Sequence, residues 1–329
     1  MSLPQTTLVD GHGRSVTYLR LSITDRCDFR CVYCMSEDMT FLPRSQVMDA
    51  DELVAIATAF VRQGVTRIRL TGGEPLIHPD LLTLVSRIKA LPSLRELTLT
   101  TNGARLDTLA EPLKQAGLDR LNISLDSLKP DRFRRLTRTG RLDKVLAGID
   151  AAQAAGFARI KLNTVMLRGR NDDEILDLVR FARHRELDLA FIEEMPLGDI
   201  VEHDRALSFM PSDAVLSRIE EHFPLRRSAE ETGGPARYYR MDDSPIRVGV
   251  ISPHSNNFCG SCNRVRVTAS GRLLLCLGND NAVELRPLAG QPERLEQAID
   301  DAMIHKPERH HFSLNEPTSI VRFMNLTGG

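Results

Sequence analysis

Short strand-like segments alternate with helical patterns along the first two thirds of this sequence. Six segments rich in leucine and β-branched residues occupy residues 19–24, 67–71, 95–100, 120–125, 159–165 and 188–193. From the second segment on, they are spaced by roughly 25 to 40 residues, the length of a βα unit. Because such alternation places parallel strands under a layer of helices, the sequence predicts an α/β fold. Six units favour a partial (βα)6 barrel of the TIM type over a closed barrel of eight.

Two of the intervening helices have clear signals. The first begins at Asp49-Ala-Asp-Glu52, which resembles a capping box, and ends at Gly64. Its apolar stripe consists of Leu53, Ile56, Ala57, Phe60 and Val61. The stripe of the second helix consists of Ile175, Leu178, Val179 and Ala182.

After about residue 225 the pattern changes to short strands joined by turns. The strand-like segments are 236–241, 246–251, 264–269 and 272–276, and Ser270-Gly271 is expected to form a hairpin turn. A helix and a basic, histidine-bearing loop follow between residues 286 and 311. We therefore predict that residues 1–225 form the partial barrel and residues 226–329 a C-terminal antiparallel β extension that closes its open side.

Bulk composition excludes several classes of protein. The chain has 329 residues, of which 42% are hydrophobic and 26% charged, as expected for a globular protein. A net charge of −1 gives no reason to expect nucleic acid or an anionic membrane as a partner. No apolar run approaches 18 residues, and the N-terminal residues lack the apolar core of a secretory signal. We expect a cytoplasmic protein.

Six cysteines fall into two groups of three, with none between the groups. They are Cys27, Cys31 and Cys34, and Cys259, Cys262 and Cys276. Structural cysteines would be scattered, and disulfide frameworks are typical of small secreted chains. The grouping therefore predicts two metal sites.

The first group follows a predicted strand and has the spacing CxxxCxxC. Three thiolates this close can hold three corners of a 4Fe–4S cube, which leaves the fourth iron free to bind a small molecule. A zinc site is the alternative, but it needs a fourth ligand and none is near. Placement on a loop after a barrel strand favours a catalytic role.

A second motif, Thr71-Gly-Gly-Glu-Pro75, directly follows the second strand. Gly72 and Gly73 would let the backbone approach a ligand closely, and Glu74 could bind an ammonium group. Alone the motif could be an ordinary turn. Together with CxxxCxxC it matches the turn with which radical S-adenosylmethionine enzymes hold the methionyl amino group.

The second cysteine group leaves two interpretations open. With His254 as a fourth ligand it could bind zinc, whereas after the first motif a second 4Fe–4S cluster with an open corner is favoured. Arg264 and Arg266 follow Cys262 and share one face of a strand. If a cluster lies beside them, the two arginines favour an anion such as a triphosphate as ligand. If no cluster is present, the two arginines would belong to a solvated strand edge. His305, His310 and His311 are more typical of a solvated basic loop than of metal ligands.

Taken together, the motifs resemble the GTP 3′,8-cyclase family of radical S-adenosylmethionine enzymes, which acts in molybdenum cofactor biosynthesis. The resemblance spans the chain and rests on LRLSITDRCDFRCVYC, RLTGGEP, TTNG, NISLDS, KLNTV, FIEEMP, FCGSCNRVRVT, LCLG and a terminal Gly-Gly.

The resemblance implies a lyase with two 4Fe–4S clusters and S-adenosylmethionine as cofactors. It assigns S-adenosylmethionine to Tyr33, Gly72, Gly73, Glu74, Ser124 and Met195. It assigns GTP to Arg20, Arg69, Thr100, Lys161, Arg264, Val265 and Arg266, with its guanine on the open iron of the second cluster. Arg264, Arg266, Gly328 and Gly329 would act in catalysis, the two glycines by inserting towards the S-adenosylmethionine site.

The implied reaction begins when the 5′-deoxyadenosyl radical takes a hydrogen from ribose C3′ of GTP. The C3′ radical then adds to guanine C8, and reduction gives 3′,8-cyclo-7,8-dihydro-GTP. The implied partners are an electron donor, cyclic pyranopterin monophosphate synthase as the next enzyme and a second copy of the chain.

One position departs from the family pattern. Ala190 precedes Phe-Ile-Glu, where many relatives have a basic residue, so the substrate pocket must lack that side chain or replace it. Three other functions remain open: a peptide-modifying radical enzyme without GTP affinity, an iron–sulfur electron carrier that does not turn over S-adenosylmethionine, and a structural zinc protein.

Overall fold

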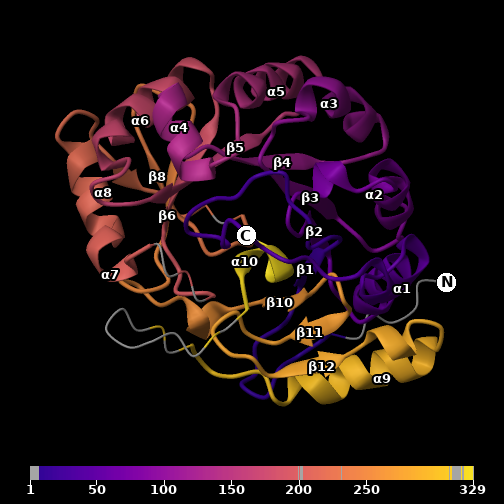
Figure 1. Cartoon of the computed structure of the whole chain (residues 1–329). Coiled ribbons are helices and arrows are strands. Elements are labelled where there is room, and N and C mark those ends of the chain that lie inside the picture. Colours follow the sequence, from indigo (N-terminus) through magenta and orange to yellow (C-terminus); the bar gives the residue numbers. More distant parts are fainter. Residues whose placement is uncertain are drawn as a thin grey trace.

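The computed structural model describes residues 7–198, 200, 203–230, 232–310, 312, 320 and 322–328. Figure 1 shows the strands as an inner ring with most helices outside it, and the helix α10 (Met324–Thr327) lies inside the ring. Two residues of the predicted site and loop, Gly329 and His311, lie outside the described part.

The predicted barrel units are confirmed. Six strands pair in parallel in chain order, each with the next. They are β1 (Tyr18–Ser22), β2 (Arg67–Thr71), β3 (Glu96–Thr101), β4 (Arg120–Ser124), β5 (Ile160–Met166) and β6 (Asp188–Glu193). All lie within about two residues of the segments predicted from the sequence.

Helices lie outside the ring of strands, except α10, which lies inside it (Figure 1). They are α1 (Ala50–Arg62), α2 (Leu81–Lys89), α3 (Leu106–Gln115), α4 (Pro130–Thr137), α5 (Leu142–Ala154), α6 (Ile175–His184), α7 (Arg205–Ser208), α8 (Ser212–Glu220), α9 (Pro292–Met303) and α10 (Met324–Thr327). The capping box of α1 is confirmed, because Asp49 accepts from the Glu52 amide and Glu52 accepts from the Asp49 amide. The predicted apolar stripes of α1 and α6 are buried.

The C-terminal strands extend both edges of the barrel sheet. They are β7 (Arg226–Arg227), β8 (Arg237–Arg240), β9 (Arg247–Ile251), β10 (Arg264–Val267), β11 (Arg272–Leu274) and β12 (Ala282–Glu284). In the part of the chain described, one twelve-stranded sheet runs β12-β11-β10-β1-β2-β3-β4-β5-β6-β9-β8-β7. No hydrogen-bonded pairing between described residues joins its two ends, so the ring is not closed by hydrogen bonds.

The antiparallel C-terminal extension is confirmed, and two of its strands join the barrel by parallel pairs. β9 pairs in parallel with β6, and β10 pairs in parallel with β1. The remaining pairs are antiparallel, including the β10–β11 hairpin with Gly271 at its turn. A short turn can join only antiparallel neighbours, whereas the parallel pairs β6–β9 and β1–β10 join strands that lie far apart in the chain. The sheet is continuous across residue 225, and the predicted domain boundary there stays a prediction.

Strand alternation gives the ring an apolar outside and a polar inside. On β1 and β2, Leu19, Leu21, Ile68 and Leu70 belong to the core under the helices. The intervening residues point the other way, because successive side chains of a strand face opposite sides. The inward positions of β1 to β5 include Arg20, Ser22, Arg69, Thr71, Thr98, Thr100, Asn122, Ser124, Lys161 and Asn163. The described residues include no helix long and apolar enough to span a membrane.

Candidate active site

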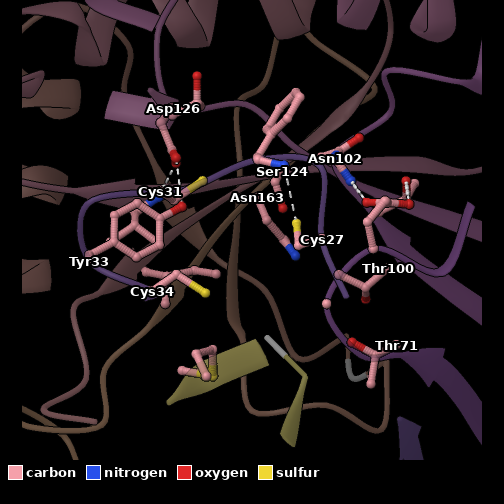
Figure 2. A pocket seen from close by; sticks show the side chains of 18 of the residues that line it. Cys27, Cys31, Tyr33, Cys34, Thr71, Thr100, Asn102, Ser124, Asp126 and Asn163 are labelled. Atoms are coloured by element: carbon pink, nitrogen blue, oxygen red, sulfur yellow. Dashed lines mark hydrogen bonds between the residues drawn. The ribbon is translucent and has the colours of Figure 1, made fainter. Parts of the chain in front are cut away.

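The first cavity opens at the carboxyl ends of the barrel strands. Figure 2 shows Cys27, Cys31 and Cys34 on the loop after β1, facing side chains from β3, β4 and β5. Of the residues assigned to S-adenosylmethionine, all six line this cavity: Tyr33, Gly72, Gly73, Glu74, Ser124 and Met195. Thr100, which was assigned to GTP, lines this cavity too.

The two glycines after β2 are required because the neighbouring backbone leaves no room for a Cβ atom, not because a ligand needs the space. Gly72 has φ +140°, and a Cβ atom there would lie 2.2 Å from the Thr24 carbonyl oxygen. A Cβ atom on Gly73 would lie 2.1 Å from the Arg26 carbonyl oxygen. The glycines therefore let β2 pack directly against the loop that leads to Cys27.

Glu74 is fully buried and tightly held. Its Oε1 atom accepts from the Leu76 amide at 2.9 Å and from the Thr101 hydroxyl at 2.6 Å. Its Oε2 atom accepts only from the Asn102 amide, at 2.6 Å, which leaves that oxygen with capacity for another donor. Burial raises the pKa of Glu74 to about 7. A ligand ammonium would stabilise the ionised form.

Tyr33 is fixed by a carboxylate that the sequence analysis did not single out. Its hydroxyl donates to Asp126 Oδ2 at 2.6 Å, and Asp126 Oδ1 accepts from the Val165 amide at 2.9 Å. Burial raises the pKa of Asp126 to about 6. The only hint was its place in Leu125-Asp-Ser127 at the end of a strand.

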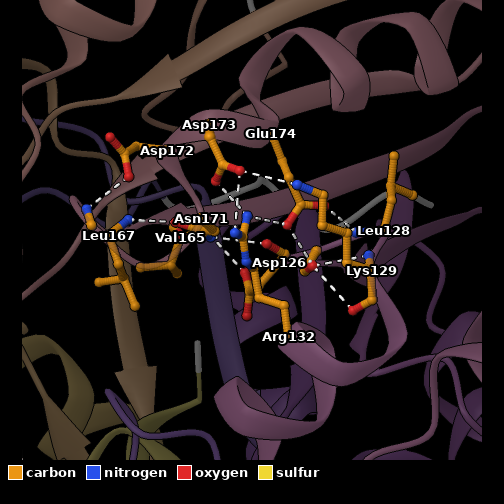
Figure 3. Close-up of polar contacts among 12 residues, drawn as sticks. Asp126, Leu128, Lys129, Arg132, Val165, Leu167, Asn171, Asp172, Asp173 and Glu174 are labelled. Atoms are coloured by element: carbon orange, nitrogen blue, oxygen red, sulfur yellow. Dashed lines mark hydrogen bonds and ion pairs between the residues drawn. The ribbon is translucent and has the colours of Figure 1, made fainter.

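A second layer of polar contacts holds the loop that contains Asp126 (Figure 3). Asn171 donates to the carbonyl oxygens of Asp126 and Val165, each at 2.9 Å. Glu174, wholly buried, accepts from the Ser127 hydroxyl and from Arg132, each at 2.7 Å. The loop after β4 is therefore rigid, which fixes the direction of Asp126 and of Tyr33.

The first three cysteines have neutral thiols in this buried setting. Burial raises the pKa of Cys27 and Cys31, and it raises the pKa of Cys34 to about 12. None is in a disulfide. Thiolates form readily only on binding a metal, because the metal replaces the proton.

The second cavity lies beside the first. Asn163, Ile192 and Met195 line both cavities, so the two share a wall. The second cavity brings together the three later cysteines and the predicted GTP residues other than Thr100, namely Arg20, Arg69, Lys161, Arg264, Val265, Arg266, Cys259, Cys262 and Cys276.

Three of these arginines form a row across the sheet. Arg20 on β1 pairs in register with Arg69 on β2 and with Arg266 on β10. Burial, followed by Arg266 and Arg69, lowers the pKa of Arg20, and burial lowers the pKa of Arg266 to about 9. Buried Nε and Nη2 of Arg20 and Nε of Arg69 have no hydrogen-bond partner. We refer to Arg20, Arg69 and Arg266 as the arginine row.

This geometry contradicts the alternative of a solvated strand edge. β10 lies inside the sheet, between β1 and β11, and Arg264 and Arg266 both line the second cavity. Like charges in neighbouring strand positions are destabilising, and buried unpaired guanidinium groups are costly. An anion in the cavity would remove both costs.

The histidines are placed differently from the expectation. His254 does not reach the second cysteine group, because its Nε2 atom contacts the Glu194 carbonyl oxygen at 3.0 Å. His310 was expected to be solvated but is buried, with Nδ1 3.0 Å from Cys259 Sγ and Nε2 2.9 Å from the Pro253 carbonyl oxygen. This was missed because Pro253 and Cys259 meet His310 only in the folded chain. His305 is exposed, as expected.

The C-terminal segment reaches both cavities. Met324 lines the first cavity, and its amide donates to the Cys34 carbonyl oxygen at 3.4 Å. The Gly328 carbonyl oxygen accepts from Arg266 Nη1 at 2.8 Å. Gly328 has φ +72°, and a Cβ atom there would lie 2.2 Å from Thr71 Cγ2. Glycine is therefore the one residue that fits this position without displacing its neighbours.

Ala190 leaves no visible gap. It is fully buried in β6 and pairs with Asn163 and Gly249 on the neighbouring strands. Lys161, two residues before Asn163, points to the second cavity with Nζ 3.5 Å from the Tyr238 hydroxyl. The second cavity thus has a cation from β5, the neighbour of β6 in the sheet.

The fold and this site define a radical S-adenosylmethionine enzyme. A model of the Radical SAM superfamily matches residues 21–182, and a model named Molybdenum Cofactor Synthesis C matches residues 187–312. Among solved structures, Streptococcus suis SuiB bound to S-adenosylmethionine has a similar fold, with a TM-score of 0.61 and 17% identity over 84% of this chain and 65% of that chain.

The chain belongs to the GTP 3′,8-cyclase family. It is 62% identical to the GTP 3′,8-cyclase of Pseudomonas entomophila (strain L48) over 98% of each chain. It is 59% identical to that of Marinobacter nauticus (strain ATCC 700491 / DSM 11845 / VT8), over 99% of this chain and all of that one. Membership carries with it a 4Fe–4S cluster and S-adenosylmethionine, and the resemblance inferred from the motifs is confirmed.

Proposed function

We propose that this chain converts GTP into (8S)-3′,8-cyclo-7,8-dihydroguanosine 5′-triphosphate, the first step of molybdenum cofactor biosynthesis. The observation that carries the proposal is the arginine row beside a cavity that adjoins the Cys27–Cys34 loop. A triphosphate suits the row, because guanidinium groups make charge-assisted, bidentate contacts with phosphate.

Cys27, Cys31 and Cys34 would hold the cluster that serves S-adenosylmethionine. Their thiols fit, since they line one cavity, are free of disulfides and leave a fourth corner without a cysteine. When bound, this cluster supplies the electron that cleaves S-adenosylmethionine into methionine and a 5′-deoxyadenosyl radical. Glu74 would receive the methionyl ammonium on Oε2, and Tyr33, Gly72, Gly73, Ser124 and Met195 would form the rest of the pocket.

Cys259, Cys262 and Cys276 would hold a second 4Fe–4S cluster whose open corner orients guanine. This placement would point the GTP ribose towards the shared wall at Asn163 and Met195, and so towards the first cavity. Proximity of this kind converts a reaction between two molecules into one within a single site. Thr100, Lys161, Arg264 and Val265 would complete the nucleotide contacts.

Gly328 and Gly329 would close the site. Gly328 contacts Arg266 and packs on Thr71, so it lies where ribose and adenosyl groups would meet. Excluding water there protects a reactive radical. The proposal also includes a cytoplasmic location, an electron donor, cyclic pyranopterin monophosphate synthase as the enzyme that takes the product, and a homodimer.

The test is anaerobic incubation of the reconstituted protein with reductant, S-adenosylmethionine and GTP deuterated at C3′. Deuterium leaves C3′ and one proton and one electron are returned, so the product has the composition of unlabelled GTP and is separated from it by chromatography. We expect deuterium in the 5′-deoxyadenosine, detected by mass spectrometry. Unlabelled 5′-deoxyadenosine with no new nucleotide would refute the proposal.

A further inference from the structure

Lys306 is a buried ammonium group beside the second cysteine group. It lies in the turn after α9, where its amide donates to the Met303 carbonyl oxygen, and only 2% of the residue is exposed. Its Nζ atom donates to the Leu275 carbonyl oxygen at 2.8 Å and to Cys262 Sγ at 3.5 Å. The first contact holds the residue before Cys276, and the second reaches Cys262 itself.

No described carboxylate forms an ion pair with Lys306. A buried ammonium without a counter-charge is costly, so the position needs a negative partner. Three thiolates more than offset the positive charge of an iron–sulfur core, so a cluster on Cys259, Cys262 and Cys276 would provide that partner. The mechanism proposed above gives Lys306 no role.

The two cysteine groups differ in their electrostatic surroundings. Lys306 Nζ donates to the Cys262 sulfur, and the second cavity is lined by Arg20, Arg69, Lys161, Arg264 and Arg266. The cavity of the first group is lined by Glu74, Asp126, Glu193 and Glu194. Among the described residues, no lysine or arginine nitrogen donates to a sulfur of the first group. The first site is therefore acidic in character and the second basic.

We propose that Lys306 is a positioning residue for the second cluster, whose ammonium donates to the Cys262 sulfur and raises the reduction potential of that cluster. Positive charge and hydrogen bonds to sulfur both favour the reduced, more negative cluster. Without them the second cluster would need a stronger reductant to reach its reduced state. The inference rests on the proposed function, because it requires a 4Fe–4S cluster on the second cysteine group.

The experiment isolates the second cluster. In a parent protein with Cys27→Ala, Cys31→Ala and Cys34→Ala, Lys306→Met removes the charge and keeps the length of the side chain. The midpoint potential is measured by redox titration with electron paramagnetic resonance detection. We expect a tenfold lower ratio of reduced to oxidised cluster at a fixed potential, which is about 59 mV for one electron.

Two variants make the comparison specific. Lys306→Arg keeps the charge and should keep most of the potential. Lys114→Met removes an exposed lysine on α3, far from both cysteine groups, and should leave the potential unchanged. GTP affinity should stay within about twofold of the parent in Lys306→Met, since Lys306 does not line the second cavity.

The outcomes separate the two proposals. Fewer than about four irons in the parent would refute the second cluster itself. Four irons and an unchanged potential in Lys306→Met would refute the role of Lys306 and leave the cluster in place. If Lys306→Met holds no cluster, Lys306→Gln is titrated instead: a lowered potential supports the inference and an unchanged one overturns it. If Lys306→Met and Lys306→Gln lose the cluster and Lys306→Arg keeps it, the role of Lys306 is supported. If all three variants lose the cluster, that role is overturned.

Discussion

At the scale of single residues, the arginines of the second cavity explain why an anion is expected there. Arg20, Arg69 and Arg266 lie in one register row and are not compensated by carboxylates within that row. Such an arrangement lowers the stability of the empty protein. It is retained where a ligand supplies the missing charge.

Removing either cavity arginine of β10 should weaken GTP binding. A charge-assisted contact contributes about 1.5–3 kcal/mol, so Arg264→Ala and Arg266→Ala should each lower affinity about tenfold or more, with iron content unchanged. Arg264→Lys should also be impaired, because lysine cannot form a bidentate fork. Equilibrium dialysis measures the effect, with Arg227→Ala on the exposed strand β7 as the control. Unchanged affinity in both alanine variants would contradict the assignment.

S-adenosylmethionine binding should depend on pH through Glu74. Burial raises its pKa to about 7, so the carboxyl is largely neutral at lower pH and cannot attract an ammonium. Affinity should therefore rise as the pH increases from about 6 to about 7.5.

Glu74→Gln is the matched variant. The amide keeps the size of the side chain but has no charge, so binding should be weak and independent of pH in this range. Calorimetric titration of the reconstituted protein measures both. A flat profile for the unaltered protein would exclude an ionic contact at Glu74.

The site residues that would bind the metal or the ligands directly could be predicted from the sequence. The residues that hold them in place could not. The cysteines were found from their spacing, whereas the roles of the Gly-Gly-Glu turn and of the arginines came from the resemblance to a known family. Asp126, Lys306 and His310 were missed, because aspartate, lysine and histidine usually lie at the surface. Their burial depends on contacts between segments distant in the chain, such as Lys306 with Leu275 and His310 with Pro253.

At the scale of elements, the strands and helices of the barrel could be predicted closely because their apolar periods are clear. The pairing of β9 and β10 could not, since residue alternation is the same in a parallel and an antiparallel strand. The short helix α10 gave no periodic signal, and its place inside the ring depends on Asn325 donating to the Asp25 carbonyl oxygen at 2.9 Å.

The C-terminal segment should tolerate only glycine at position 328. Gly328→Ala adds a Cβ atom 2.2 Å from Thr71 Cγ2 and should displace the segment, so cyclised product should fall strongly while iron content and GTP binding persist. Gly156→Ala is the matched control, because Gly156 has φ +73° with nothing within 4 Å of the added atom. Both variants place an L side chain at a residue with positive φ. Full product formation by Gly328→Ala would show that the segment is dispensable.

At the scale of the whole molecule, two cysteine groups far apart in sequence share one interior. The sequence predicted two metal sites but not that their cavities share a wall, because the strand after Cys262, β10, reaches the barrel only through its pairing with β1 in the folded protein.

Metal content should follow directly from this arrangement. Anaerobic reconstitution should give about eight irons per chain, and replacing Cys27, Cys31 and Cys34 together should leave about four and abolish 5′-deoxyadenosine formation. Iron and zinc are measured by inductively coupled plasma mass spectrometry. One zinc per chain in the second site would contradict the prediction.

The pairing of β1 with β10 has a consequence for synthesis of the protein on the ribosome. The partner of β1 on that side is made on the order of 240 residues later, roughly 10 to 50 s at about 5–20 residues per second. During that interval the nascent chain carries an open strand edge in the middle of its future sheet. Open edges are templates for association between chains. Chaperone occupancy of the unfinished barrel, and aggregation of fragments that stop before β10, follow from this topology.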